Sequence, residues 1–267
     1  MVCARFGSPS LTARVKGISV FNALVSLLST VFGIVGCASY TNSQDNISRA
    51  PWHVTYIKFK TGDLDAKAYI GWGIQSYLHW TQVTGGDKSF GWSLYDPNET
   101  NTEPIPYAAE KLVNEAFVAG GGQPIPELTN YAAACDKASK GVVTLCSLAL
   151  ICCFVAFICH LLRACCDSTF AKDLSVLGGT VAFILGIISY SIYVPCSNAI
   201  NAAFIQQMAE NLPSPIPVDQ YHYGYGIGSA VVAACFGMMI WTSLVSLVIP
   251  VAEAEKTPVP TGEVTKV

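Results

Sequence analysis

Four long stretches of the chain contain no Asp, Glu, Lys or Arg, and this pattern limits the possible folds more than any other feature. They cover residues 17–37, 141–162, 174–195 and 221–251. Each reaches or exceeds the roughly 20 residues that an α-helix needs to cross about 30 Å of hydrocarbon. Because backbone polar groups in lipid must be satisfied within the segment, we expect all four to be helices. The sequence therefore predicts a polytopic membrane protein.

The basic residues favour one orientation of these spans. Arg5, Arg14 and Lys16 precede the first span, and no acidic residue accompanies them. Under the positive-inside rule, this flank predicts a cytoplasmic N-terminus. The predicted segments are a cytoplasmic N-terminus (1–16), a first span (17–37), a large extracytoplasmic loop (38–137), a second span (138–162), a cytoplasmic loop (163–173), a third span (174–195), a second extracytoplasmic loop (196–223), a fourth span (224–251) and a cytoplasmic tail (252–267).

The first apolar stretch has an alternative interpretation as a cleaved signal peptide. Ile34-Val35-Gly36-Cys37 has the small-residue pattern of a bacterial lipoprotein cleavage site. The stretch is longer than the 7–15 apolar residues typical of a signal. We therefore expect a retained span, and cleavage would leave three.

The large loop between the first two spans carries a strand pattern. Residues 52–60 are rich in β-branched and aromatic side chains. Residues 66–83 form a second strand candidate, which we expect to be kinked at Gly71 and Gly73. The loop is therefore predicted to contain a small antiparallel sheet.

Three further segments complete the predicted outer region. Residues 90–95 are a candidate third strand, and residues 107–118 have the spacing of a short amphipathic helix that ends at Gly120-Gly121-Gly122. Residues 221–225 alternate Tyr with His and Gly, which is typical of an aromatic belt at a membrane interface. The predicted fold is thus a membrane four-helix transmembrane bundle with a small antiparallel β-sheet plus a short helix in the first outer loop.

Aromatic side chains of the large loop divide into expected core residues and expected contacts. The expected sheet core is Trp52, Trp72 and Trp80. The interaction candidates in the loop are Phe59, Tyr69 and Tyr77. Because aromatic residues on strands lie in a core more often than at an interface, burial is the alternative for all three.

Several residues are candidates for modification or for scaffold binding. Asn46 and Asn98 lie in Asn-x-Ser/Thr sequences, which are N-glycosylation acceptors on an extracytoplasmic surface. Cys165 and Cys166 follow the second span and are candidates for lipidation by S-palmitoylation. The chain ends in Thr-Lys-Val, so the carboxylate of Val267 is a candidate ligand for a PDZ-type scaffold.

Three cysteines fall at the predicted outer ends of spans and are disulfide candidates. They are Cys37, Cys135 and Cys196, and two of them could pair in an oxidising space. A bond between Cys37 and Cys135 would close the large loop at its base. The choice of partners stays open at this stage, because spacing alone does not fix it. His160 lies near the end of the second span, and we expect it to reach the cytoplasmic interface.

Familiar catalytic and nucleic-acid-binding patterns do not occur in the sequence. It has no HExxH, GxSxG or Walker motif, and no cysteine spacing of a zinc site. The formal net charge of −3 gives no nucleic-acid signal. The four charge-free stretches by definition carry none of the acidic or basic residues that ion-coupled transporters place inside the membrane. We expect no enzyme activity, no cofactor, no metal and no nucleic-acid partner.

The layout resembles the claudin-like tetraspan superfamily, which includes claudins, peripheral myelin proteins, calcium-channel gamma-type subunits, fungal cortical-patch tetraspans and amastins. Trp52 and the later Gly71-Trp72-Gly73 are similar to the tryptophan and Gly-Leu-Trp strands of claudins, and residues 135–141 resemble their entry to the second span. Cys165-Cys166 and the terminal Thr-Lys-Val also match claudin positions for lipidation and PDZ binding. The chain is divergent, because residues 38–134 lack the cysteine pair that claudins and amastins carry in this loop.

These observations predict a non-enzymatic membrane protein with a structural, adhesive or membrane-organising role through its first outer loop. The expected partners are membrane lipids and other membrane proteins or further copies of the chain, beside it or across membranes. One alternative is an auxiliary subunit of a channel, transporter or larger membrane complex, and another is an oligomeric pore-former. We expect the plasma membrane to be its site, with an organellar membrane as the alternative.

Overall fold

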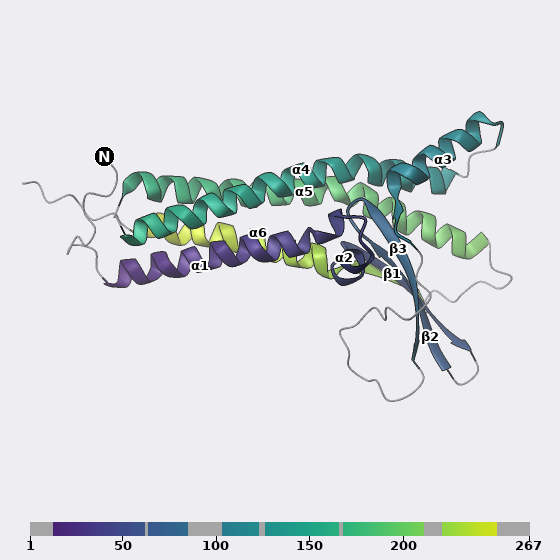
Figure 1. Ribbon diagram of the computed structural model, residues 1–267, viewed down its shortest axis with the longest axis horizontal. Helices are drawn as coiled ribbons and strands as arrows, with labels where there is room; N and C mark the ends of the chain where they lie inside the picture. The colour runs from purple at the N-terminus through teal and green to yellow at the C-terminus, as the bar shows by residue number, and fades with distance from the viewer. Residues whose placement is uncertain are drawn as a thin grey trace, which may run out of the picture.

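The computed structural model describes residues 13–61, 64–84, 103–122, 126–165, 168–210 and 221–249. Its long helices run side by side as a rod, and a sheet is attached at one end of the rod (Figure 1). The four long helices are α1 (Ala13–Gly36), α4 (Pro126–Cys165), α5 (Thr169–Glu210) and α6 (Ile227–Val248). Within the described residues, four helices are long and apolar enough to cross a membrane. The prediction of four apolar helices is confirmed.

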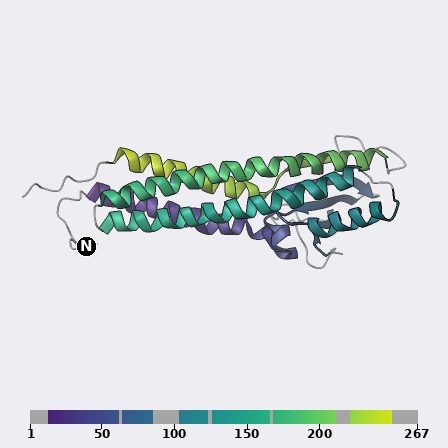
Figure 2. The same cartoon turned by 90° about the horizontal axis from the view of Figure 1, so that it is seen from above.

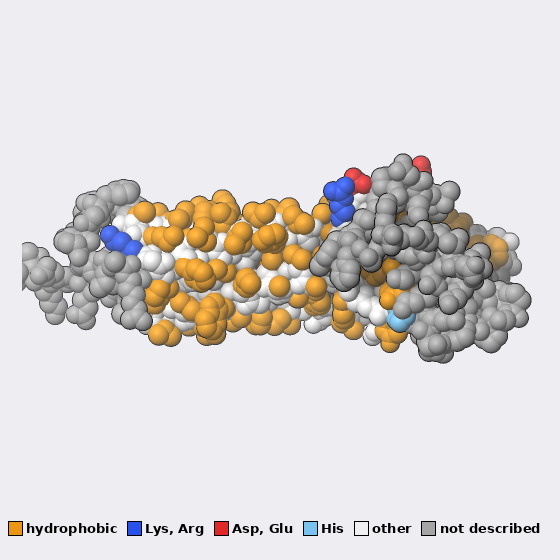
Figure 3. All heavy atoms as spheres, turned by 90° about the horizontal axis from the view of Figure 1, so that it is seen from below, with side chains coloured by type: hydrophobic (Ala, Val, Ile, Leu, Met, Phe, Trp, Pro, Cys, Tyr) orange, Lys and Arg blue, Asp and Glu red, His pale blue; other side chains and the backbone are white. Residues whose placement is uncertain are grey.

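Helix α1 shows why the rod suits a lipid environment. Its buried positions hold small or polar residues such as Ser19, Asn22 and Ser26, whereas Phe21 and Leu24 are exposed. Small residues let helix backbones approach closely, and large apolar residues are stable when they face lipid. Figure 3 shows the same arrangement, a band of apolar side chains along the rod with charged side chains at its two ends.

The two longest helices extend past the predicted spans. Helix α4 begins at Pro126 and α5 ends at Glu210, so they run on together toward the sheet (Figure 2). Residues 196–210, which the sequence pattern assigned to the second outer loop, continue α5 in spite of Pro195 inside that helix. The rod therefore projects a pair of helices beyond its apolar band, and the sheet rests against them.

A disulfide between Cys135 and Cys196 links these projecting parts of α4 and α5. Cys37 is a free thiol, so the considered Cys37–Cys135 bond does not form. The reason is geometric. Helices α4 and α5 are adjacent along their length and place Cys135 and Cys196 with Cα atoms 4.6 Å apart. Cys37 instead follows the C-terminus of α1 and lies near Cys146 of α4.

The sheet has five strands in the order β4-β3-β2-β1-β5, and all neighbours are antiparallel. The strands are β1 (His53–Thr61), β2 (Leu64–Trp72), β3 (Ser76–Thr84), β4 (Ile105–Pro106) and β5 (Tyr221–Tyr225). The kinked strand predicted at 66–83 was wrong, because the chain reverses at Gly73 and makes two strands. The aromatic belt predicted at 221–225 is β5, which pairs with β1 from Ile57↔Tyr221 to His53↔Tyr225.

Three short helices accompany the sheet: η1 (Ala38–Tyr40), α2 (Gln44–Arg49) and α3 (Tyr107–Ala119). The helix predicted at 107–118 is α3. It ends in a Schellman motif, in which Gly122 N–H donates to Phe117 C=O at 3.0 Å and Gly121 N–H donates to Val118 C=O at 3.0 Å. Gly121 has φ +87°, which favours glycine at this position. The predicted strand at 90–95 lies outside the described residues.

The end of the rod farthest from the sheet holds a buried polar cluster. Arg163, assigned from sequence to a loop, lies inside α4 and is 1% exposed. Its guanidinium donates to the carbonyl oxygens of Ser246 (3.4 Å) and Ile249 (2.9 Å), at the C-terminus of α6. Asn22 Nδ2 donates to Ser246 Oγ at 3.3 Å, so α1, α4 and α6 are joined here. His160 is fully buried, and the expectation that it reaches the interface was wrong.

Candidate functional site

Trp52 holds the sheet on the helix bundle. Its side chain is fully buried, and its indole N–H donates to the Gly36 carbonyl at the end of α1 (2.9 Å). Its ring packs against Tyr190 and Tyr193 of α5, with centroid distances of 5.7 and 5.1 Å. Its backbone N–H donates to Trp72 C=O in β2 at 2.8 Å. One residue thus joins two bundle helices to the sheet.

The start of α6 crosses the segment that leads into β1 at close range, beside Trp52. Gly228 N–H donates to Pro51 C=O at 2.9 Å, and Gly226 N–H donates to Trp52 C=O at 2.8 Å. A Cβ atom at Gly226 would lie 2.1 Å from Pro51 O, so this approach requires glycine. The start of α6 is therefore fixed to the strand that begins the sheet.

A second aromatic layer fills the space between the sheet and α4. Trp72 and Tyr77 pair across β2 and β3 with ring centroids 4.9 Å apart. Tyr131 of α4 meets Trp72 edge-on at 5.7 Å, and Tyr107 of α3 stacks on Tyr77 at 6.0 Å. The predicted core role of Trp52 and Trp72 is confirmed by their burial.

His53 connects the first strand to the extension of α5. Its Nε2 lies 3.0 Å from Asn201 Oδ1, and its Nδ1 lies 3.3 Å from Ser197 Oγ. Burial lowers the pKa of His53 below its usual 6.5, and the hydrogen bond with Asn201 offsets part of that effect. The imidazole is therefore held neutral and hydrogen-bonded on both nitrogens.

The opposite face of the sheet is covered by α2. Ile47 of α2 packs with Tyr69 and Leu78, and all three are buried. Tyr69 and Tyr77 are 6% and 7% exposed, so their prediction as contact residues was wrong. Because side chains alternate along the strands, Tyr69 points toward α2 on one face of the sheet and Tyr77 points toward α3 and α4 on the other. Both faces of the sheet are therefore covered at these two residues. The side chains of Phe59 and Trp80 lie outside the described part of the structure.

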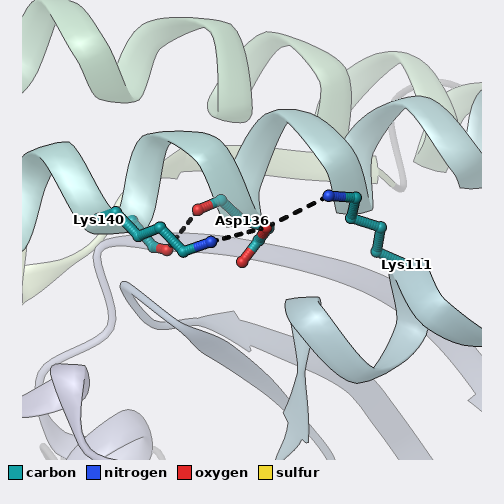
Figure 4. A network of polar contacts seen from close by, with 4 residues as sticks. Lys111, Asp136 and Lys140 are labelled. Carbon is teal, nitrogen blue, oxygen red and sulfur yellow. Dashed lines mark hydrogen bonds and ion pairs between the residues drawn. The ribbon is translucent and has the colours of Figure 1, made fainter.

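Helix α3 docks on the extension of α4 through polar side chains. Tyr131 donates its hydroxyl to Glu110 Oε1. Asp136 Oδ2 lies 3.6 Å from Lys111 Nζ and 3.3 Å from Lys140 Nζ, and Figure 4 shows both ammonium groups directed toward it. Burial raises the pKa of Glu110 above its usual range, although the bond from Tyr131 opposes this shift.

The other side of α3 is apolar and exposed. Leu112, Val113 and Phe117 are 65%, 66% and 58% exposed, and Val118 is exposed beside them. The sequence predicted an amphipathic helix, for which an inward apolar face is the usual arrangement. In the structure only Tyr107, at the start of α3, is buried, and Glu110 and Lys111 make polar contacts with α4 instead of an apolar face. This outward apolar face of α3, formed by Leu112, Val113, Phe117 and Val118, is the candidate interaction surface, and burial data rather than periodicity identify it.

The remaining candidates are dispersed. Asn46 lies on α2, and its Nδ2 donates to Thr41 Oγ1 at 2.7 Å on the protein surface. Cys165 is exposed at the end of α4 that is remote from the sheet. Asn98, Cys166 and Val267 lie outside the described residues.

Comparisons with known proteins do not assign a family. No protein-family model matches the sequence, and a search of curated proteins finds no significant match. Among the side chains that the structure describes, no three His, Cys, Asp or Glu residues gather where they could hold a metal ion.

Proposed function

We propose that this is a non-enzymatic four-span membrane protein whose outer domain binds another membrane protein, in a structural, adhesive or membrane-organising role. The observation that carries the proposal is the outward apolar face of α3. Apolar patches rimmed by polar residues on a protein surface mark interaction sites more often than isolated apolar residues do. The four-span layout, with its resemblance to claudin-like proteins, supports the same role.

The domain that carries α3 is built to present a surface rather than to move. The sheet is fixed to α1 and α5 by Trp52, to α6 by the Gly226–Gly228 crossing, and to α5 by His53. The disulfide joins the two helices on which the domain rests. A surface held in this way loses little conformational entropy when it binds a partner.

The proposed orientation places the sheet end of the rod outside the cytoplasm. The basic flank of the first span supports this orientation, as does the Cys135–Cys196 disulfide, because such bonds persist in oxidising compartments. Glycosylation mapping at Asn46 and Asn98 tests it. Modification of either site on the native chain agrees with the orientation. Acceptor sites that are modified only when placed in the loop near residues 166–167 overturn it.

A cross-linking experiment on the full chain tests the proposed contact. Photoactivatable residues at Val113 or Val118 are expected to give a discrete adduct with one membrane protein in native membranes, and mass spectrometry identifies it. The double variant Leu112→Ser/Phe117→Ser removes apolar area from the same face and is expected to abolish the adduct. Leu112→Met/Phe117→Leu is the matched control, which keeps the face apolar and is expected to retain it.

The identity of the adduct distinguishes the roles. An adduct between two copies of the chain favours self-association, whereas a constant adduct with one larger complex favours an auxiliary subunit. If the serine variant cross-links as the wild-type chain does, the outward face of α3 is not the contact surface and the proposal fails.

A further inference from the structure

A cavity of about 360 Å³ lies between α1 and α4, below the sheet. Its lining is mostly apolar, with two free thiols among the wall residues. Principal lining residues are Ile34, Cys37, Ile74, Val143, Cys146 and Leu150.

The cavity has a fixed floor and a fixed roof. A Cβ atom at Gly33 would lie 2.5 Å from Leu150 Cδ2, so α1 and α4 meet at this level. Above it, Ile74 in the turn between β2 and β3 forms the roof. The backbone N–H of Ile74 donates to Ser39 C=O in η1 at 3.2 Å, which ties that turn to the end of α1. The cavity is thus part of the junction between bundle and sheet.

The surroundings of the cavity are those of a lipid-facing surface. Ile34, which lines the cavity from α1, is large, apolar and exposed, and so is Ile151, which follows the lining residue Leu150 on α4. Both helices are long and apolar enough to cross a membrane. A recess that opens on such a surface meets hydrocarbon, and apolar recesses of this kind are poor sites for water.

We propose that this cavity binds one acyl chain of a membrane phospholipid. The chain enters between α1 and α4 and its tail lies under Ile74, while the headgroup stays outside. Binding follows from close packing against a shaped wall, since hydrocarbon in the cavity and hydrocarbon in the bilayer are equally apolar.

Two polar side chains of the cavity wall are already engaged within the protein. Thr41, a hydroxyl residue of the lining, donates to Ala38 C=O at 3.0 Å and accepts from Asn46 Nδ2 at 2.7 Å. The Cys146 thiol donates to Ser189 Oγ at 3.6 Å. An acyl tail needs no hydrogen bond and therefore leaves both contacts intact. A sterol would place its hydroxyl at Tyr40 or Ser147, the other hydroxyl residues of the lining, and the sterol probe described below tests that alternative.

Photolabelling of the full chain in nanodiscs tests the proposal. The probe is phosphatidylcholine with a diazirine near the end of one acyl chain, and a sterol diazirine probe is run in parallel. We expect saturable phosphatidylcholine adducts on the peptides around residues 34–41 and 143–150, removed by excess unlabelled phosphatidylcholine. Even labelling of all lipid-facing helices, or saturable labelling by the sterol probe alone, overturns the proposal.

Two variants of equal bulk sharpen the test. Val143→Trp fills the cavity and is expected to lose the saturable adduct. Leu148→Trp places the same ring on the lipid-facing side of α4, where Leu148 is 46% exposed, and is expected to keep it. Retention of the adduct by Val143→Trp overturns the proposal.

A measurement on the wild-type chain avoids any folding defect of the variants. Cys37 lines the cavity and is a free thiol, so excess phosphatidylcholine is expected to slow its alkylation by a lipid-soluble maleimide. Cys152, free and half-buried on α4 outside this lining, is the internal control whose rate stays unchanged. Equal effects on both thiols contradict the proposed site. The outcome does not depend on α3, so it can fail or succeed separately from the proposed protein contact.

Discussion

Replacing Trp52 with phenylalanine is expected to loosen the sheet from the bundle. The substitution removes the indole N–H that donates to Gly36 C=O at 2.9 Å and shortens the ring between Tyr190 and Tyr193. Gly36 ends α1, and its carbonyl is one of those that lack a partner inside the helix. The variant therefore leaves a buried acceptor unpaired at the point where α1 meets the sheet.

The expected cost is the sum of two effects. An unsatisfied buried acceptor costs about 1–3 kcal/mol, and a small cavity beside the shorter ring adds about 1 kcal/mol. A total of about 2–4 kcal/mol corresponds to an unfolding midpoint lower by about 4–16 °C for a chain of this size. Thermal unfolding in mild detergent, followed by light scattering and near-ultraviolet circular dichroism, measures the shift.

Trp241→Phe is the matched control for this substitution. Trp241 lies on α6 and is 61% exposed, so its replacement is expected to change stability by less than about 0.5 kcal/mol. Hydrogen exchange should also show earlier opening of the last turn of α1 and of β1 in the Trp52 variant alone. If the two phenylalanine variants unfold at the same temperature, Trp52 does not anchor the sheet and the reasoning is refuted.

Three further predictions concern the sheet and the helices that support it. Cys135→Ser removes a crosslink that spans 61 residues, and the loss of its chain-entropy effect is expected to lower stability by about 4 kcal/mol and so to lower the unfolding midpoint. Cys37 is not crosslinked, so Cys37→Ser should leave the unfolding midpoint nearly unchanged in the same thermal assay. Because burial raises the pKa of Glu110 above 4.5, α3 docking is strongest at low pH and weakens as the pH rises through that raised pKa. Hydrogen exchange of the α3 amides should show this dependence, and the Glu110→Gln variant should lack it. Because burial lowers the pKa of His53 below 6.5, the contribution of His53 to stability is complete above about pH 6.5 and is lost as the pH falls toward the lowered pKa. Hydrogen exchange of the β1 amides should show this loss in the wild-type chain but not in the His53→Gln variant.

The bundle was predictable from sequence because its signal is local. Four charge-free stretches give four apolar helices, and a run of glycines after residue 119 gives the end of α3. Each pattern lies within one short, continuous stretch of the sequence. The extensions of α4 and α5 are less visible, since residues 126–140 and 196–210 mix polar with apolar side chains and Pro195 suggests an end that does not occur.

The sheet was only partly predictable because its pairing is not local. Strand β5 pairs with β1 across most of the chain, and no pattern within residues 221–225 specifies that partner. The strand candidate at 66–83 contains the reversal at Gly73, where a Cβ atom would lie 2.7 Å from Ser39 O. That crowding comes from η1, so the sequence of the strand alone does not distinguish a kink from a turn.

The buried tyrosines and the outward face of α3 have a common cause. Tyr69 and Tyr77 resemble contact residues until α2, α3 and α4 are placed over the two faces of the sheet. Once α3 uses Glu110 and Lys111 to meet α4, Leu112, Val113, Phe117 and Val118 are left outside. Sequence periodicity shows how residues divide between the two sides of a helix. Which side faces the protein depends on the side chains of the neighbouring element, here Tyr131 and Asp136 of α4.

The placement of β5 also explains how a sheet without internal cysteines can be stable. Two-stranded hairpins are marginal in water, and residues 38–134 contain no cysteine. Strand β5 extends the sheet and leads directly into α6, while β1 follows the segment that ends α1. The first and last bundle helices therefore hold adjacent strands, so that separating the sheet requires either breaking the β1–β5 pairing or moving those helices apart. The bundle itself therefore holds the sheet in place of a cross-link within the loop, and Cys135–Cys196 joins the other two helices beneath the sheet.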